Sequence, residues 1–133
     1  MLQSIYTKIA QVLGSENFGT AYVYSDKKYE SRLNTRFANV DVLSNKAVGK
    51  AIANDGTLFE EYEIEVKITL YFKQGESTFG IQPTLDSLFQ RFYRNTQLNI
   101  TNIFLKPVRY TSVYKCLQSE IILNISYLTE VTS

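Results

Sequence analysis

Three glutamates, Glu61, Glu63 and Glu65, stand at alternate positions of the stretch E-E-Y-E-I-E-V-K-I-T-L-Y-F (residues 60–72). Alternate residues of a strand lie on one face about 7 Å apart, a separation within reach of paired catalytic carboxylates in glycoside hydrolysis. Such pairs usually come from different elements that flank a cleft and give the two groups different pKa values. A row along one strand has no second element of this kind. The pattern therefore favours a solvated or partner-facing surface, on which Lys67 also lies.

Residue types that support other chemistries are scarce in this chain. There is no histidine, which is the commonest general base and a usual zinc ligand. Cys116 is the single cysteine, so neither a C-x-x-C pair nor a disulfide within the chain can form. None of the six glycines stands in a phosphate-binding loop. We therefore expect a protein that is not an enzyme and that holds no cofactor or metal.

The composition predicts one globular domain over residues 1–133. Hydrophobic residues make up 44% of the chain and charged residues 20%, which is ordinary for a domain with a substantial core. Lysine and arginine number 14 against 13 aspartates and glutamates, so no overall positive field attracts nucleic acid. No apolar run approaches the roughly 18–20 residues of a membrane span. We expect no membrane contact and a protein made in a cytoplasm.

Hydrophobic periodicity predicts an α+β fold, with a mostly antiparallel sheet and two helices packed on one of its faces. The expected helices cover about residues 2–13 and 83–97, the second with Pro83 in its first turn. The expected strands cover residues 20–25, 32–43, 58–73, 98–105, 108–115 and 117–131. In the strand over 58–73, the even positions from Tyr62 to Phe72 are apolar, so this face belongs to the core.

Residues 44–56 form a segment of a different kind, S-N-K-A-V-G-K-A-I-A-N-D-G. It is rich in small residues, has no aromatic side chain, and closes on an Asn-Asp-Gly turn signal. We therefore expect a long flexible loop at about 44–56. Loops of this length without regular structure are usually functional or mobile, which makes Lys46 and Lys50 candidate interface residues.

Charge is unevenly distributed along the chain. Residues 57–81 hold five acidic and two basic groups, whereas residues 82–133 hold three acidic and five basic groups. This suits a head-to-tail contact between identical subunits, but the same groups can also pair across neighbouring strands of one chain. Both alternatives stay open, with Arg109 and Lys115 as candidate interface residues. The run from Arg109 to Lys115 also interleaves basic and aromatic side chains, as single-strand nucleic-acid binders do, but without a wider basic surface.

Three short patterns and the order of the elements resemble one known family. A strand begins near N-T-R-F (residues 34–37), the long strand ends in Y-F-K (residues 71–73), and the closing strand contains I-S-Y (residues 125–127). With an N-terminal helix and a second helix of Leu/Phe spacing, the chain resembles the tail terminator (tail-completion) proteins of long-tailed bacteriophages and phage-like tail particles. The resemblance covers most of the chain, and the segment 44–56 departs from it.

The resemblance implies a structural protein of the virion tail, assembled in the bacterial host cytoplasm. Its copies would form a ring, expected to be a homohexamer, that caps the tail tube protein and joins a head-completion protein. DNA would pass through the ring lumen without specific binding. The face with Glu61, Glu63, Glu65 and Lys67 would front that lumen or meet Arg109 and Lys115 of the next subunit. The segment 44–56, with Lys46 and Lys50, would become ordered on contact with the tail tube or with a neighbouring subunit.

Two other classes of protein are compatible with a chain of this size. One is another head–tail connector or neck protein, which the sequence does not separate from a tail terminator. The other is a small cone-shaped α+β domain that binds a ligand. A ligand pocket needs polar groups that converge inside it, and the inward positions of the long strand offer only the hydroxyl of Tyr62. The pattern therefore disfavours the ligand-binding domain.

Overall fold

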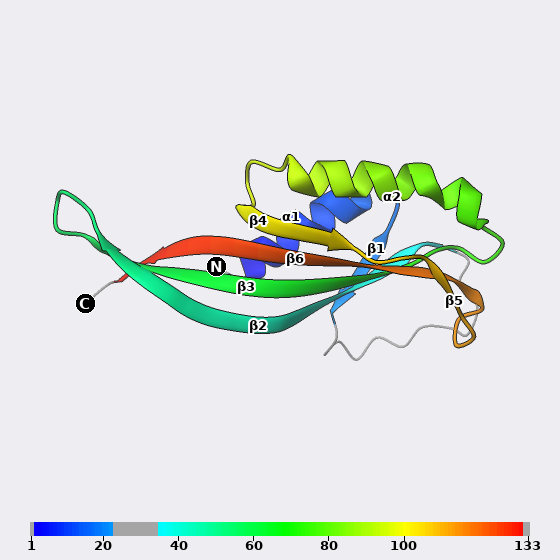
Figure 1. Ribbon diagram of the computed structural model, residues 1–133, viewed down its shortest axis with the longest axis horizontal. Coiled ribbons are helices and arrows are strands. Elements are labelled where there is room, and N and C mark those ends of the chain that lie inside the picture. The colour runs from blue at the N-terminus through cyan, green and yellow to red at the C-terminus, as the bar shows by residue number, and fades with distance from the viewer. Residues whose placement is uncertain (1, 23–34, 132–133) are drawn as a thin grey trace.

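The computed structural model describes residues 2–22 and 35–131, which form one sheet with two helices on one of its faces (Figure 1). In chain order the elements are α1 (Leu2–Gly14), β1 (Gly19–Tyr22), β2 (Phe37–Ile52), β3 (Leu58–Tyr71), α2 (Thr78–Tyr93), β4 (Ile100–Leu105), β5 (Arg109–Thr111) and β6 (Cys116–Glu130). The predicted α+β class with both helices on the same side is confirmed.

The sheet has the strand order β1-β2-β3-β6-β4, and β5 pairs with β6 beyond β4. The pairs β2–β3, β3–β6, β4–β6 and β5–β6 are antiparallel, as predicted. The pair β1–β2 is parallel, which the sequence analysis did not anticipate. The strand expected at 20–25 is described only to Tyr22, and the strand expected from residue 32 begins at Phe37. The parts of both predictions that fall on residues 23–34 lie outside the described residues.

The core lies between the helices and the sheet. From β3 it receives the side chains of Ile64, Val66, Ile68 and Leu70, and from the next residue the ring of Phe72, all fully buried. The covering side chains include Ile9 and Leu13 of α1 and Leu85, Leu88 and Phe92 of α2. Burial of one such side chain contributes about 1.5–3 kcal/mol. The predicted apolar face of the long strand is therefore confirmed, except that Tyr62 is only half-buried.

The predicted loop at 44–56 is wrong, because β2 continues to Ile52 and pairs with β3 along its whole length. The connection is a short turn, in which the Ala53 N–H donates to the Thr57 carbonyl at 2.8 Å. Two β-bulges, between Val42 and Ser44 and between Ala47 and Gly49, each insert a residue and interrupt the period-two pattern. Small residues have weak strand preference, which here is overridden by pairing with β3.

The bounds of α2 also differ from the prediction. The helix begins at Thr78, and the Ser77 hydroxyl caps it by accepting a hydrogen bond from the Gly80 N–H at 3.0 Å. Pro83 lies inside the helix and not in its first turn. The helix ends at Tyr93, before the expected 97, and the Asn95 side chain accepts hydrogen bonds from two following N–H groups. A capping serine was therefore a stronger start signal than proline.

Arg36 makes a group of charged contacts beside the core, which we call the clamp. The Arg36 guanidinium lies 2.6 Å from the Glu76 carboxylate and also donates to the Glu16 carbonyl at 3.1 Å. It stacks over the rings of Phe18 and Phe72, 5.6 Å from each centroid. Burial raises the pKa of Glu76, but hydrogen bonds from Arg36 and from a backbone N–H outweigh it, so the pKa is lowered below its ordinary 4.5. The clamp ties the end of α1 to the turn before α2.

Candidate functional site

The most unusual feature of the molecule is an arm of strands that projects beyond the helices (Figure 1). We define the arm as residues 43–63 of the β2–β3 hairpin together with residues 127–130 of β6, which run beside it. Every residue from 43 to 52 is exposed, whereas the next inward position of β3, Ile64, is fully buried. In the arm the sheet has lost its helical cover, so both of its faces meet solvent.

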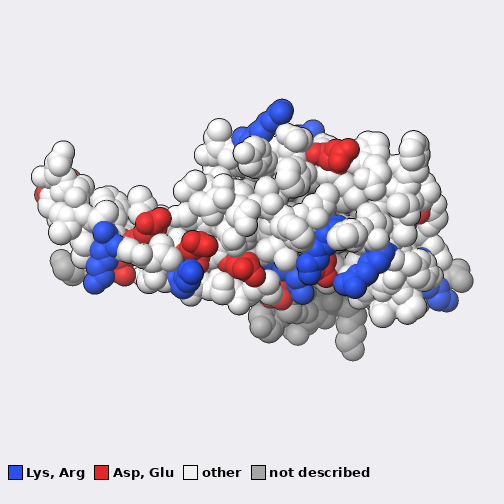
Figure 2. Space-filling model, viewed as in Figure 1, with Lys and Arg blue, Asp and Glu red and all other residues white. Residues whose placement is uncertain are grey.

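The glutamate row lies on the sheet face that points away from the helices, at the base of the arm. Glu63 stands opposite Lys46 and Lys67 stands opposite Asp41 in the strand ladder. Figure 2 shows the resulting alternation of acidic and basic side chains along the arm. Within the described residues, none of these groups has an ion pair within 4 Å. The row is therefore a stripe of mixed charge on an open surface.

The remaining members of the row have few polar contacts of their own. Glu61 accepts a hydrogen bond from the Ser126 hydroxyl at 3.0 Å. Glu65 stands opposite Ser44 in the ladder. Lys50 is opposite Glu60, on the helix side of the ribbon, and the Glu60 carboxylate accepts a hydrogen bond from the Tyr62 hydroxyl at 3.0 Å. The structure thus brings Lys46 and the row onto one face and places Lys50 on the other.

Arg109 and Lys115 lie at the opposite end of the molecule from the arm, which we call the β5 end (residues 106–115 with Glu120; Figure 1). Arg109 is 70% exposed, and its guanidinium is 3.7 Å from the Glu120 carboxylate. Lys106 pairs more closely with the same carboxylate, at 3.1 Å. Pairing of Arg109 or Lys115 with the glutamate row inside one chain is therefore excluded by distance along the molecule.

Sequence reasoning missed two residues of the β5 end, Lys106 and Glu120. Glu120 is 10% exposed, yet its carboxylate is shared by two cations. A cavity of about 260 Å³ lies beside it, where the chain passes from β4 to β5 through Pro107. A glutamate within the hydrophobic run of the last strand was the available signal, since a buried carboxylate needs a cationic partner.

Exposed large hydrophobic side chains gather at the same two ends. The described residues include nine of them. Four belong to the arm and two to the β5 end: Leu43, Val48, Ile52 and Leu128, then Tyr110 and Val113. The other three are Phe79, Tyr93 and Phe104. Apolar groups surrounded by polar ones are typical of contact surfaces.

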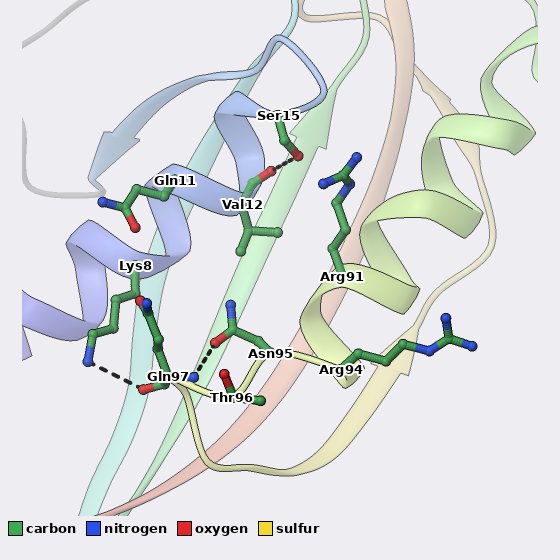
Figure 3. Close-up of a pocket in the computed structure, with 9 residues that line it drawn as sticks. All are labelled: Lys8, Gln11, Val12, Ser15, Arg91, Arg94, Asn95, Thr96 and Gln97. Carbon is green, nitrogen blue, oxygen red and sulfur yellow. Dashed lines mark hydrogen bonds between the residues drawn. The ribbon is translucent and has the colours of Figure 1, made fainter.

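A cavity of about 400 Å³ between the C-terminal ends of α1 and α2 has a cationic lining (Figure 3). Lys8 donates to the Gln97 carbonyl at 3.3 Å. Arg91 points toward Ser15, whereas Arg94 points away from the other two cations. Because the three charges do not converge on one point, this cavity lacks the geometry of an anion-binding site. Arg91 and Arg94 lie at the C-terminal end of α2, where positive charge is favourable.

The described part of the chain contains no group of three histidine, cysteine, aspartate or glutamate residues placed to hold a metal ion. Cys116 is buried, and burial raises the pKa of its thiol, which disfavours the reactive thiolate.

None of the described helices combines the length and the apolar character that crossing a membrane requires.

Comparison with known proteins does not assign this chain to a family. No protein-family model matches this chain, and no curated protein matches it either. The resemblance to phage tail terminators therefore stays a prediction from the sequence.

Proposed function

We propose that this chain is a non-enzymatic assembly protein whose copies form a ring, and that the ring acts as a tail terminator. In this proposal the ring is a hexamer that caps the tail tube, joins the head through a head-completion protein, and lets DNA pass through its lumen without specific binding. The observation that carries the assembly function is the arm, which extends two strands of the core sheet into solvent.

An arm of this kind is poorly stabilised by the chain itself. A ribbon of two strands is marginally stable by itself in water, and independent stability needs three or more strands with a hydrophobic face or packing against a helix. The arm has no helix packed against it, although the same strands are covered from Ile64 onward. Its inner face holds the stacked rings of Tyr62 and Tyr127, 5.4 Å apart, of which Tyr127 also packs against the edge of the core. A second molecule that covers the arm supplies the missing layer.

The contact expected of the arm uses its faces and not its edge. β1 pairs with β2 only over residues 37–40, so the outer edge of β2 from residue 41 to 52 meets no other described strand. Along this edge stand Lys46, Lys50 and both bulges. Charged side chains and bulges are the devices that keep an open edge from pairing with another strand. The arm is thereby protected from uncontrolled aggregation while its faces stay available.

The geometry gives less support to an enzyme or a ligand-binding domain. The inward positions of β3 are filled by packed aliphatic and aromatic side chains. The carboxylates that could act in pairs stand in a row on one open face, whereas paired catalytic carboxylates usually come from different elements that flank a cleft. The exposed arm suits an assembly protein, and a head–tail connector could use it in the same way.

Shortening the arm tests the proposal. Because Lys46 and Glu63 face each other in the ladder, residues 47–62 can be replaced by Asn-Gly, which forms a two-residue hairpin turn. We expect the full chain to form rings in native mass spectrometry and negative-stain images, and to cap isolated tail tubes. The shortened chain should keep its helical circular dichroism and remain monomeric.

The outcomes are distinguishable. A full-length protein that stays monomeric at all concentrations, or a shortened chain that still forms rings, would overturn the proposed role of the arm. Rings that fail to cap tubes but bind head-completion particles would instead identify a connector.

A further inference from the structure

We infer that the arm of one copy docks against the β5 end of the next copy, in a head-to-tail contact. In this contact the carboxylates at the base of the arm, Glu63 and Glu65, face Arg109 and Lys115 of the neighbour. The inference rests on the proposed function, because it names the surfaces through which the ring would form.

Charge complementarity is the first support. The arm carries five carboxylates against two lysines: Asp55, Glu60, Glu61, Glu63 and Glu130, with Lys46 and Lys50. Glu65 lies just inside it. The β5 end carries three cations, Lys106, Arg109 and Lys115, against one carboxylate, that of Glu120, which pairs with Lys106 and Arg109. Each end therefore has an excess of one sign, and the signs are opposite. Complementary potentials of this kind orient two surfaces and fix their register.

The exposed hydrophobic groups are an independent support. The arm offers Val48, Ile52 and Leu128, and the β5 end offers Tyr110 and Val113, each between 44% and 74% exposed. Stable interfaces combine an apolar centre with a charged rim, and tyrosine is enriched at their centres. Each of the two ends thus carries both components of a contact surface.

The shape of the molecule makes the contact intermolecular. The arm and β5 stand at opposite ends of the longest axis (Figure 1), so an arm does not meet the β5 end of its own chain. The two surfaces differ, which makes the contact heterologous. A heterologous contact repeated by a rotation that divides a full turn closes a ring, whereas other rotations give an open filament. A second copy of this chain is therefore the occupant that the two ends fit.

Reciprocal charge reversal tests the contact. The arm variant is Glu63→Lys with Glu65→Lys, and the end variant is Arg109→Glu with Lys115→Glu. Each variant alone should weaken ring formation by about tenfold or more, because two surface pairs become repulsive. Mixed in equal amounts, the two variants should recover rings, since each end of one then complements the opposite end of the other. Native mass spectrometry should show both variants in equal number.

A variant with all four substitutions should also form rings by itself, because it again has opposite charges at its two ends. The matched control is Lys8→Glu with Arg94→Glu, which makes the same charge change as the end variant on two cations of the helical layer. This control should form rings as the unchanged protein does. Thermal unfolding followed by circular dichroism should show that every variant is folded.

The failure of the inference and that of the proposed function give different results. A full-length protein that never oligomerises contradicts the proposed function itself. Rings that form equally well with both single-end variants contradict the head-to-tail contact and leave the proposed function standing. Loss of rings without recovery in the mixture overturns it as well. A filter-binding measurement with single-stranded DNA completes the test. If the unchanged protein binds this DNA, and only the end variant loses the binding while its rings still form, the β5 end is a nucleic-acid contact instead.

Discussion

The two halves of β3 differ in what covers them. From Ile64 to its last inward residues the strand lies under two helices, and its inward side chains are fully buried. From Leu58 to Glu63 the same strand continues in the same ladder, but with no helix above it. The half from Ile64 onward builds the core, and the half from Leu58 to Glu63 offers a surface. Strand pairing and core packing are thus separable in this fold, and pairing extends well beyond what the core requires.

The largest expected difference between the halves concerns stability. Leu70→Ala removes a fully buried side chain from β3 and should lower the free energy of unfolding by about 2–5 kcal/mol. Ile52→Ala removes a side chain of the arm that is 74% exposed and should change it by less than about 0.5 kcal/mol. Urea unfolding of dilute, monomeric protein measures both. Equal losses would mean that the arm packs on the body in solution.

The clamp that borders the core should give the next largest effect. Arg36→Met leaves the partly buried Glu76 carboxylate without its bidentate partner and should cost about 1–3 kcal/mol. Arg36→Lys keeps the charge but loses the fork of donors, so it should recover only part of the loss. Urea unfolding at neutral pH compares the three proteins. Full recovery by lysine would show that charge alone, and not geometry, is what the clamp requires.

The same clamp makes the stability of the body depend on pH. The pKa of Glu76 is lower in the folded chain than its ordinary 4.5, so the unfolded chain binds its proton more readily. Its stabilising contribution is therefore complete above about pH 4.5 and is lost as the pH falls through the lowered pKa. Glu76→Gln should flatten this part of a plot of unfolding free energy against pH. An unchanged slope would assign the acid dependence to other carboxylates.

The smallest expected effect lies in the arm. The Tyr62 hydroxyl donates to the Glu60 carboxylate, which raises the pKa of Tyr62 above its ordinary 10.0. Glu60→Gln should bring this pKa back toward 10.0 in a titration of the ring resonances by NMR, since the hydrogen bond and the nearby charge are its main causes. Tyr62→Phe should leave the urea midpoint of unfolding nearly unchanged. A clear loss of stability would indicate that this inner face is buried against a partner.

The sequence predicts the body of the molecule better than it predicts the arm. Strict alternation along β3 and helical spacing in α1 identify their buried faces because one side of each meets the core. In β2 the alternation stops where the helical cover stops, so residues 44–52 resemble a loop although they pair. The parallel pairing of β1 with β2 was not predicted, because hydrophobic periodicity indicates a strand but not the direction of its partner.

The candidate site was predictable in its residues but not in their arrangement. The glutamate row shares one face, as the period of two requires. Which cations face it depends on the register of β2, and the register places Lys46 beside Glu63 but leaves Arg109 beside Glu120. Two bulges set that register, and bulges leave no reliable trace in composition. The sequence left both pairing alternatives open; the fold rules out pairing of the row with Arg109 or Lys115 inside one chain, and the head-to-tail contact is a proposal.

The bulge at Val48 affects the direction of the arm but not the pairing of its strands. Ala47 pairs with Tyr62 and Gly49 with Glu61, so Val48 is the extra residue that has no partner of its own. Its deletion would keep every cross-strand pair of the arm, yet it would remove a local bend and its added twist. The angle at which the arm leaves the body is thus adjustable by single-residue insertions and deletions at the bulge, without a change in the residues that pair across the strands.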